Sequence, residues 1–187
     1  MSLPMESPVP TQGAGEAPAS FWAWSVSVYL RPAVADHCLA LQDNIGADVN
    51  LLLWCCWTAA HHEAPLTPEL LREAEALLAP VADGLTRPLR AARRQVKTLA
   101  GVVDDAQRRR LREKILEAEL DAERLEQTLL EGLALRRLGT PVRRADGVEA
   151  LRARARASLA VYARALGLDG TNAEACHRLV SLVSAAF

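Results

Sequence analysis

The sequence lacks the features of a secreted or membrane-spanning protein. Residues 1–20 contain neither a basic start nor an apolar segment, so we expect no signal peptide. The longest apolar run, Leu51–Ala60, is interrupted by Thr58 and is half of the roughly 20 residues that a membrane-spanning helix needs. A net charge of −1 creates no overall attraction to nucleic acid or to an anionic membrane. We therefore expect a cytoplasmic protein with no membrane contact.

Recognisable catalytic motifs are missing as well. The chain has no Gly-rich phosphate loop, no Gly-x-Ser-x-Gly elbow and no His-Glu-x-x-His metal motif. Its four cysteines have no regular spacing, and Cys55 and Cys56 are adjacent, which favours reduced thiols over a disulfide framework. We expect no cofactor. Enzymatic activity stays open and is the less favoured interpretation.

Aromatic residues are scarce and are concentrated near the start of the chain. Six of the eight lie between Phe21 and Trp57, and three of the four cysteines and three of the four histidines lie in or just beyond this segment. The segment therefore specifies the core, and the sequence assigns Trp22, Leu53, Trp54 and Trp57 to it.

The apolar pattern predicts an all-α, single-domain bundle of six to eight helices with a long antiparallel αα-hairpin. Residues 21–30 fit either a strand or a helix. We interpret them as a helix because no other segment resembles a strand, and a lone strand leaves its backbone unpaired. The expected parts are a disordered leader at 1–19 and a helical domain at 20–187, divided into core helices at 20–63, a kinked helix and hairpin at 67–137, and a C-terminal helical pair at 146–187.

Residues typical of helix ends mark several boundaries. Ser20, Asp48 and Thr67 are expected N-caps, and Gly46 is an expected C-cap. Thr171–Glu174 has the pattern of a capping box, which predicts that it opens the last helix.

Two apolar rows at heptad spacing define the expected hairpin, and Pro80 and Pro88 should kink or divide the helix around its start. Each row should face the other helix, and such rows also permit self-association. The first row is Leu85, Leu89, Ala92, Val96, Leu99 and Val103, and the second is Leu111, Ile115, Ala118, Ala122, Leu125 and Leu129.

The best candidates for a metal or haem site are Cys38, Cys55, His61 and His62. Cys55 and His62 are seven residues apart and share a helical face, on which two ligands could begin a site. The Cys-x₂-Cys and His-x₃-His spacings typical of zinc sites are missing, and cysteines are often buried for packing alone. Core packing is therefore the favoured interpretation.

A polar group lies around the start of the third expected helix. Asp43, Asp48 and Asn50 could form a polar site that faces a cleft. Residues of these types more often cap helix ends and satisfy backbone amides, and this is the favoured alternative.

Charge is divided into blocks along the chain. Residues 87–114 contain ten Lys and Arg against three acids, residues 115–131 one Arg against six acids, and residues 136–164 eight Arg against two acids. In a hairpin the basic helix can pair with the acidic part of its neighbour. The basic cluster Arg108, Arg109, Arg110 and Arg112 is the candidate interaction site. We do not expect nucleic-acid binding there, because neither a recognition motif nor interleaved aromatic residues accompany the charge.

Several segments together resemble a proteobacterial conserved-hypothetical family, domain of unknown function 2390. The resemblance covers about residues 20–135, and residues 140–187 would then be an extension found in a subgroup. It implies an intracellular helical bacterial protein and supplies no catalytic residues. The segments that carry it are Phe21-Trp22-x-Trp24-Ser25-Val26-x-Val28-Tyr29, Pro32-x-Val34-Ala35, Cys38-Leu39-x-Leu41-Gln42-Asp43, Gly46-x-Asp48-Val49-Asn50-Leu51-Leu52-Leu53 through Trp57, Pro88-Leu89-Arg90-x-x-Arg93-Arg94-x-Val96-Lys97 and Glu123-Arg124-Leu125-Glu126.

The sequence therefore predicts an interaction or regulatory module without catalytic activity, with a protein partner or self-association. Two alternatives stay open. One is a metal- or haem-binding protein that uses Cys55, His61 and His62, and the other is a nucleic-acid-associated protein that uses the basic blocks at 87–114 and 136–164.

Overall fold

The computed structural model describes residues 20–62, 64–141 and 147–184, so the expected leader at 1–19 lies outside the described residues. The described part consists of helices joined by short loops, with one isolated bridge between Ala100 and Val103 and no strand, and the predicted all-α fold is confirmed. None of its helices is both long and apolar enough to span a membrane. The elements are α1 (Phe21–Tyr29), α2 (Pro32–Ile45), α3 (Val49–His61), α4 (Pro68–Val81), a π-helical segment η1 (Ala82–Thr86), α5 (Arg87–Thr98), α6 (Asp105–Leu138), α7 (Val148–Ala165) and α8 (Gly170–Val183).

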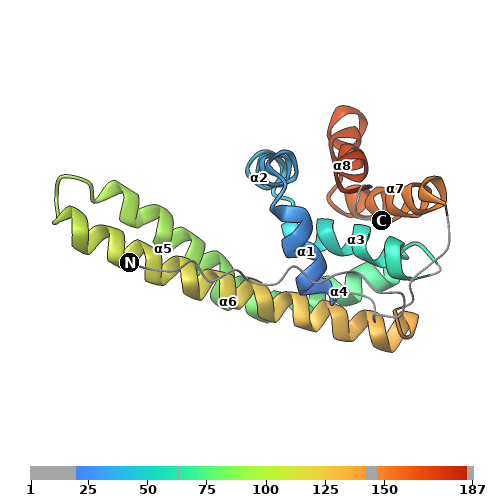
Figure 1. Ribbon diagram of the computed structural model, residues 1–187, viewed down its shortest axis with the longest axis horizontal. Coiled ribbons are helices and arrows are strands. Elements are labelled where there is room, and N and C mark those ends of the chain that lie inside the picture. The colour runs from blue at the N-terminus through green and yellow to red at the C-terminus, as the bar shows by residue number, and fades with distance from the viewer. Residues whose placement is uncertain (1–19, 63, 142–146, 185–187) are drawn as a thin grey trace, which may run out of the picture.

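The helices form a compact group from which one long hairpin extends. Figure 1 shows α5 and α6 side by side and antiparallel, reaching away from the other helices. The C-terminal half of α6 passes under the group and packs against α1, α3 and α4. Helices α7 and α8 pack on each other, and both contact α3. The predicted αα-hairpin is therefore present and attached to the bundle through α6.

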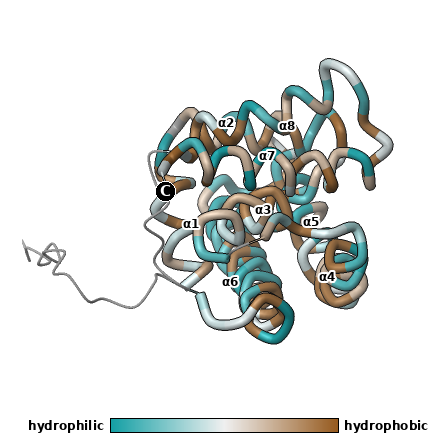
Figure 2. Tube along the Cα trace, turned by 90° about the vertical axis from the view of Figure 1, so that its right-hand side faces the viewer, coloured by the Kyte–Doolittle hydropathy of each residue, from teal (hydrophilic) through white to brown (hydrophobic). Residues whose placement is uncertain are grey.

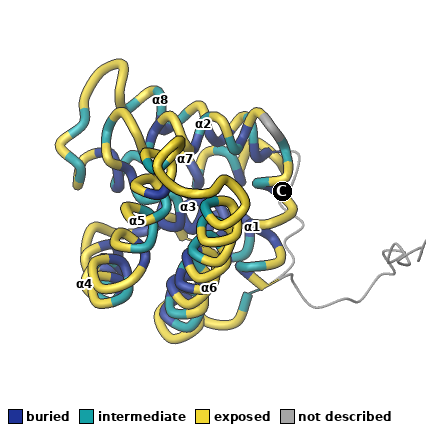
Figure 3. The backbone as a smooth tube through the Cα atoms, turned by 90° about the vertical axis from the view of Figure 1, so that its left-hand side faces the viewer, coloured by how far each residue is buried: buried dark blue, intermediate teal, exposed yellow. Residues whose placement is uncertain are grey.

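Helix α3 is the centre of the core because nearly every one of its side chains is apolar. All of its residues from Asn50 to Ala60 are buried, and Trp54 and Trp57 have no exposed surface. The ring of Trp57 lies 5.3 Å from that of Phe21, which anchors α1 on α3. Figure 2 shows hydrophobic residues along α3, and Figure 3 shows its burial among the other helices.

One residue assigned to the core from the sequence lies elsewhere. Leu53, Trp54 and Trp57 are buried, but Trp22 is only half-buried and its ring lies 5.3 Å from the guanidinium carbon of Arg124. Trp22 is on the side of α1 that faces α6, so the assignment of this residue to the core is wrong.

The predicted helix ends are confirmed at four places. The side chains of Ser20, Asp48 and Thr67 accept hydrogen bonds from backbone N–H groups of the first turn, and Gly46 has a left-handed backbone (φ 70°) after α2. The capping box predicted at Thr171–Glu174 is wrong, because α8 begins at Gly170 and its N-cap, Asp169, makes no side-chain capping bond.

The chain from α4 to α5 runs without interruption through the π-helical segment η1. Pro80 and Pro88 flank this segment, and neither can donate a backbone hydrogen bond. Two missing donors eight residues apart loosen the α-helical pattern between them, which the wider π-helical turn accommodates. The π-helical segment divides α4 from α5, and its residues Ala82 and Thr86 are buried, with Thr86 donating a hydrogen bond to Glu126 of α6.

The faces by which α5 and α6 meet differ from the predicted apolar rows. Leu85, Val103, Leu111 and Leu125 are exposed, whereas Glu119 and Glu126 are buried. The other members of the two rows divide between buried, intermediate and exposed positions. The physical reason is that α5 carries arginines on its inner face, so carboxylates on α6 take the positions that leucines would take in a coiled coil.

Candidate functional site

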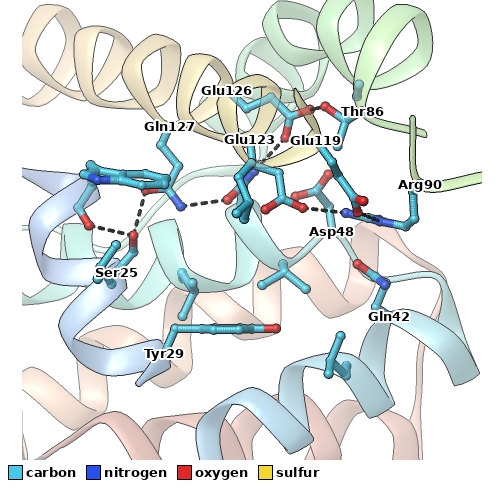
Figure 4. Close-up of a pocket in the computed structure, with 18 of the residues that line it drawn as sticks. Ser25, Tyr29, Gln42, Asp48, Thr86, Arg90, Glu119, Glu123, Glu126 and Gln127 are labelled. Atoms are coloured by element: carbon cyan, nitrogen blue, oxygen red, sulfur yellow. Dashed lines mark hydrogen bonds and ion pairs between the residues drawn. The ribbon is translucent and has the colours of Figure 1, made fainter. Parts of the chain in front are cut away.

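An open cavity of about 350 Å³ lies between α1, α2 and the inner end of the hairpin. We call it the α1–hairpin cleft. Side chains of α1, α2, the first turn of α3, η1, α5 and α6 line it, and Figure 4 shows many of them. Pockets that bind small molecules typically measure about 300–1,000 Å³ and combine apolar walls with a few placed polar groups.

One side of the cleft holds an ion-pair network between α5 and α6. The carboxylate of Glu119 accepts hydrogen bonds from Arg93 (Nε, 2.5 Å; Nη2, 3.1 Å) and from Arg90 (Nε, 3.1 Å). Arg90 also donates through Nη2 to Glu123, at 2.8 Å. Burial acts to raise the pKa of Glu119, but the hydrogen bonds from the two guanidiniums outweigh it and hold this pKa below its ordinary value. The predicted pairing of the basic and acidic arms of the hairpin therefore occurs inside the cleft.

Further along α6, the same side of the cleft holds a chain of hydrogen bonds between neutral donors and a buried carboxylate. Glu126, which is 1% exposed, accepts from Thr86 Oγ1 at 2.5 Å and from Asn50 Nδ2 at 2.6 Å. Gln127 Nε2 donates to Asn50 Oδ1 at 2.8 Å, and Ser25 Oγ donates to Gln127 Oε1 at 2.7 Å. Four helical elements are thus joined below the cleft, and these side chains are held in one arrangement.

Three groups that face the cleft have raised pKa values. Burial is the main cause for Glu126, for Glu123 and for Tyr29, whose pKa rises to about 12. Neighbouring charges add to the effect, since Asp48 raises the pKa of both Glu123 and Glu126. Figure 4 shows the ring of Tyr29 across the cleft from the side chains of α6. Shifted pKa values that gather in one cavity are typical of functional sites.

The polar group noticed at the start of α3 serves both of the roles considered. Asp48 caps α3 by accepting from Leu51 N–H at 3.1 Å, and it also lines the cleft. Asn50 lines the cleft too. Asp43 does not belong to the site, because it makes an exposed ion pair with Arg94 at 2.9 Å. The structure therefore brings two of these three residues together.

The candidate thiols and imidazoles are placed in and near the core, and none of them lines the cleft. Cys38 and Cys55 are buried, and burial raises the pKa of both thiols, to about 12 for Cys38, which disfavours the thiolate that binds metals. The rings of His61 and His62 pack on Trp57, each with centroids 5.5 Å apart, and burial lowers the pKa of His62. Among the described residues, no group of three or more His, Cys, Asp and Glu is placed to hold a metal ion.

The candidate basic cluster lies at the far end of the hairpin, on the first turns of α6. Arg109 and Arg110 are exposed, Arg112 is half-buried, and Arg108 pairs with Asp105 at 3.0 Å. None of these four arginines lines the cleft, and nucleic-acid binding at this end stays an alternative prediction.

The polar side chains of the hairpin were not predicted from the sequence to be part of a site. A signal was present, since Glu119, Glu123 and Glu126 are spaced four and three residues apart, as are Thr86, Arg90 and Arg93. Each set occupies one helical face. Two complementary charged faces on the two arms of a hairpin predict an ionic interface, and such a pattern competes with the apolar rows.

The raised pKa of Glu126 predicts a pH-dependent stability. Because the folded protein keeps this proton to a higher pH than the unfolded chain does, the free energy of unfolding should fall as the pH rises through the folded-state pKa. Glu126→Gln resembles the protonated side chain and can donate to Thr86 while accepting from Asn50. We expect the variant to match the wild type below the ordinary pKa of Glu, at about pH 4, and to exceed it once the pH is above the raised pKa, measured by urea unfolding.

The matched control is Glu117→Gln, which changes an exposed carboxylate on the same helix. The free energy of unfolding of this variant should equal that of the wild type at each pH. A difference between Glu126→Gln and wild type that does not change with pH would contradict the prediction.

Comparison with known proteins identifies a family for this chain but finds no annotated relative. Neither a curated protein nor a solved structure matches the chain. A family described as protein of unknown function matches residues 20–130, and every residue that lines the cleft lies between Trp22 and Gln127. Helices α7 and α8 lie beyond the matched segment. Since the match covers more than half of the chain and agrees with the resemblance found in its sequence, the chain belongs to the family of proteins of unknown function DUF2390.

Proposed function

We propose that this protein is a non-catalytic binding module, and that the α1–hairpin cleft is its recognition site. One observation carries the proposal: an open cavity of about 350 Å³ has exposed hydrophobic side chains on its wall and an ordered polar network on its floor. Four of the large hydrophobic residues that the protein exposes line this one cavity, and they come from three helices. They are Val26 of α1, Leu30 at its C-cap, Leu39 of α2 and Leu120 of α6.

The exposure of these residues supports binding. Leu30 is 77% exposed and Leu120 is 46% exposed, so both leave apolar surface in contact with water. Covering such surface is favourable by about 25 cal/mol per Å². Single exposed leucines are ordinary, but a group of them around one cavity is typical of a ligand-binding site.

The chemistry of the cleft supports binding over catalysis. Among the described residues that line it there is neither Cys nor His, and its most buried carboxylates, Glu119 and Glu126, are engaged in hydrogen bonds within the protein. The hydroxyl of Ser25 donates a hydrogen bond to Gln127. The described lining residues include no histidine that could activate this hydroxyl as a nucleophile. The four cysteines are buried and free, which supports the reducing cytoplasm as the compartment.

The proposal is tested with Leu120→Asp and its control Leu135→Asp. Both leucines lie on α6 and are similarly exposed, at 46% and 52%, but only Leu120 is among the residues that line the cleft. A library of small organic fragments is screened against wild type and both variants by ligand-observed NMR. We expect fragments that bind the wild type and Leu135→Asp but not Leu120→Asp.

Both variants should remain folded, because substitutions at exposed positions change stability by about 0.5 kcal/mol or less. A screen in which no fragment binds, or in which Leu120→Asp keeps all the fragments that the wild type binds, would contradict a recognition site in the cleft.

A further inference from the structure

We infer that the α1–hairpin cleft recognises an organic cation, namely an ammonium or guanidinium group carried on an apolar stem. The inference rests on the proposed function and specifies its ligand. Such a group occurs on a free amine and on a Lys or Arg side chain of a partner protein, and the two share one chemistry.

The charges of the cleft do not balance. Its lining contains four carboxylates, Asp48, Glu119, Glu123 and Glu126, and three guanidiniums, Arg87, Arg90 and Arg93. Arg87 pairs with Asp83, which is not a lining residue, so it contributes little to the cleft.

Two lining carboxylates have no cationic partner. Arg93 pairs with Glu119, and Arg90 is shared by Glu119 and Glu123. No ion pair joins Asp48 or Glu126 to a basic side chain in the described parts of the chain. A bound cation would supply a positive charge beside Asp48, and it would also favour the ionised form of Glu126, whose pKa is raised in its absence.

The accessible part of this negative site is Glu123. Its side chain is 27% exposed, whereas Glu126 is nearly fully buried behind it on the same helix. The charged groups around Glu123 come from three elements: Asp48 at the start of α3, Arg90 of α5, and Glu119 of α6. Burial and the carboxylates Glu119 and Asp48 raise the pKa of Glu123, while Arg90 lowers it, and the net shift is upward. Burial is the main cause of this shift, and it is the excess of carboxylates over available guanidiniums in the lining that favours a cation and opposes an anion.

The apolar wall fits the stem of such a ligand. The rings of Trp22 and Tyr29 and the exposed Leu30, Leu39 and Leu120 line the same cavity as Glu123. An alkyl stem can lie along these side chains while its charged end reaches Glu123 and Asp48, as the stems of long basic side chains lie on apolar surfaces. Aromatic faces near the charged end add favourable cation–π contacts.

The test compares ligands that differ only in charge. Binding of n-hexylammonium, 1-hexanol and hexanoate to the full chain is measured by NMR titration at neutral pH, following the signals of the Trp22 indole N–H and the Tyr29 ring. We expect n-hexylammonium to bind about tenfold more tightly than 1-hexanol, and hexanoate to bind more weakly than either.

Two variants identify the carboxylates involved. Glu123→Gln and Asp48→Asn remove one charge each, and asparagine keeps the capability to cap α3. Each substitution should weaken the binding of n-hexylammonium several-fold and leave the affinity for 1-hexanol unchanged. Glu117→Gln, exposed on α6, is the matched control and should change neither.

A second pair of probes distinguishes the two sources. N-acetyl-lysine methylamide and N-acetyl-arginine methylamide carry the cation as a protein would present it. Binding of these two more tightly than n-hexylammonium supports a partner side chain, and the reverse order supports a free amine.

The outcomes separate the two proposals. If 1-hexanol or hexanoate binds in the cleft as tightly as n-hexylammonium, the inference of a cation is wrong and the cleft remains a binding site. If no probe of any charge perturbs Trp22 or Tyr29, and no fragment depends on Leu120, both proposals are wrong.

Discussion

Replacing Trp57 with alanine should leave little folded protein. The indole of Trp57 has no exposed surface and lies 5.3 Å from the ring of Phe21, between α1 and α3. Truncation of a buried Trp costs about 3–5 kcal/mol, against a total stability of about 5–15 kcal/mol for a typical domain. Far-UV circular dichroism and urea unfolding of the variant should show a large loss of helix, or a midpoint shifted far below that of the wild type.

Trp22→Ala is the matched control, because it removes the same side chain one residue from Phe21 but from a half-buried position beside Arg124. A cation–π contact at such a site is worth about 0.5–1 kcal/mol, so this variant should fold. Trp57→Phe keeps an aromatic ring against Phe21, so its stability should lie between those of Trp57→Ala and Trp22→Ala. A Trp57→Ala protein as stable as Trp22→Ala would contradict the central role of α3.

The helices were predictable from the sequence because their ends and their buried faces depend on nearby residues. The caps at Ser20, Asp48 and Thr67 and the left-handed Gly46 act within one helical turn, and each was found where the sequence placed it. The exception at Thr171 has the same local origin. A capping-box pattern shows only that a helix can begin near Thr171. Helix α8 begins at Gly170 instead, and its N-cap makes no side-chain capping bond.

The cleft was not predictable in the same way, because it depends on how distant segments meet. Asn50, Thr86 and Glu126 lie far apart in the sequence and meet only after the hairpin has docked on α3. Trp22 was assigned to the core from its type alone, and its neighbour Arg124, about a hundred residues away, instead places it beside the cleft. Spacing in the sequence identifies faces of single helices, and which faces meet is decided by the complete set of contacts.

Removing the carboxylate of Glu119 should have the second large effect. Glu119 is 3% exposed and accepts three hydrogen bonds from Arg90 and Arg93, so Glu119→Ala leaves two guanidiniums facing each other without the charge between them. Breaking a buried ion pair by removing one partner costs about 3–5 kcal/mol. We expect a loss of this size in the free energy of unfolding, measured with urea at neutral pH, and Glu113→Ala, at an exposed position of α6, should change it by about 0.5 kcal/mol or less.

A double-mutant cycle with Arg93→Ala then separates the ion pair from the loss of packing. Arg93 retains no second carboxylate partner among the described ion pairs once Glu119 is removed, whereas Arg90 retains Glu123. Removing Arg93 from the Glu119→Ala background should therefore cost less than removing it from the wild type, with a coupling energy of about 0.5–3 kcal/mol. Additive losses in the cycle would show that the two side chains stabilise the hairpin independently. The charged interface between α5 and α6, and with it the fixed wall of the cleft, would then need another explanation.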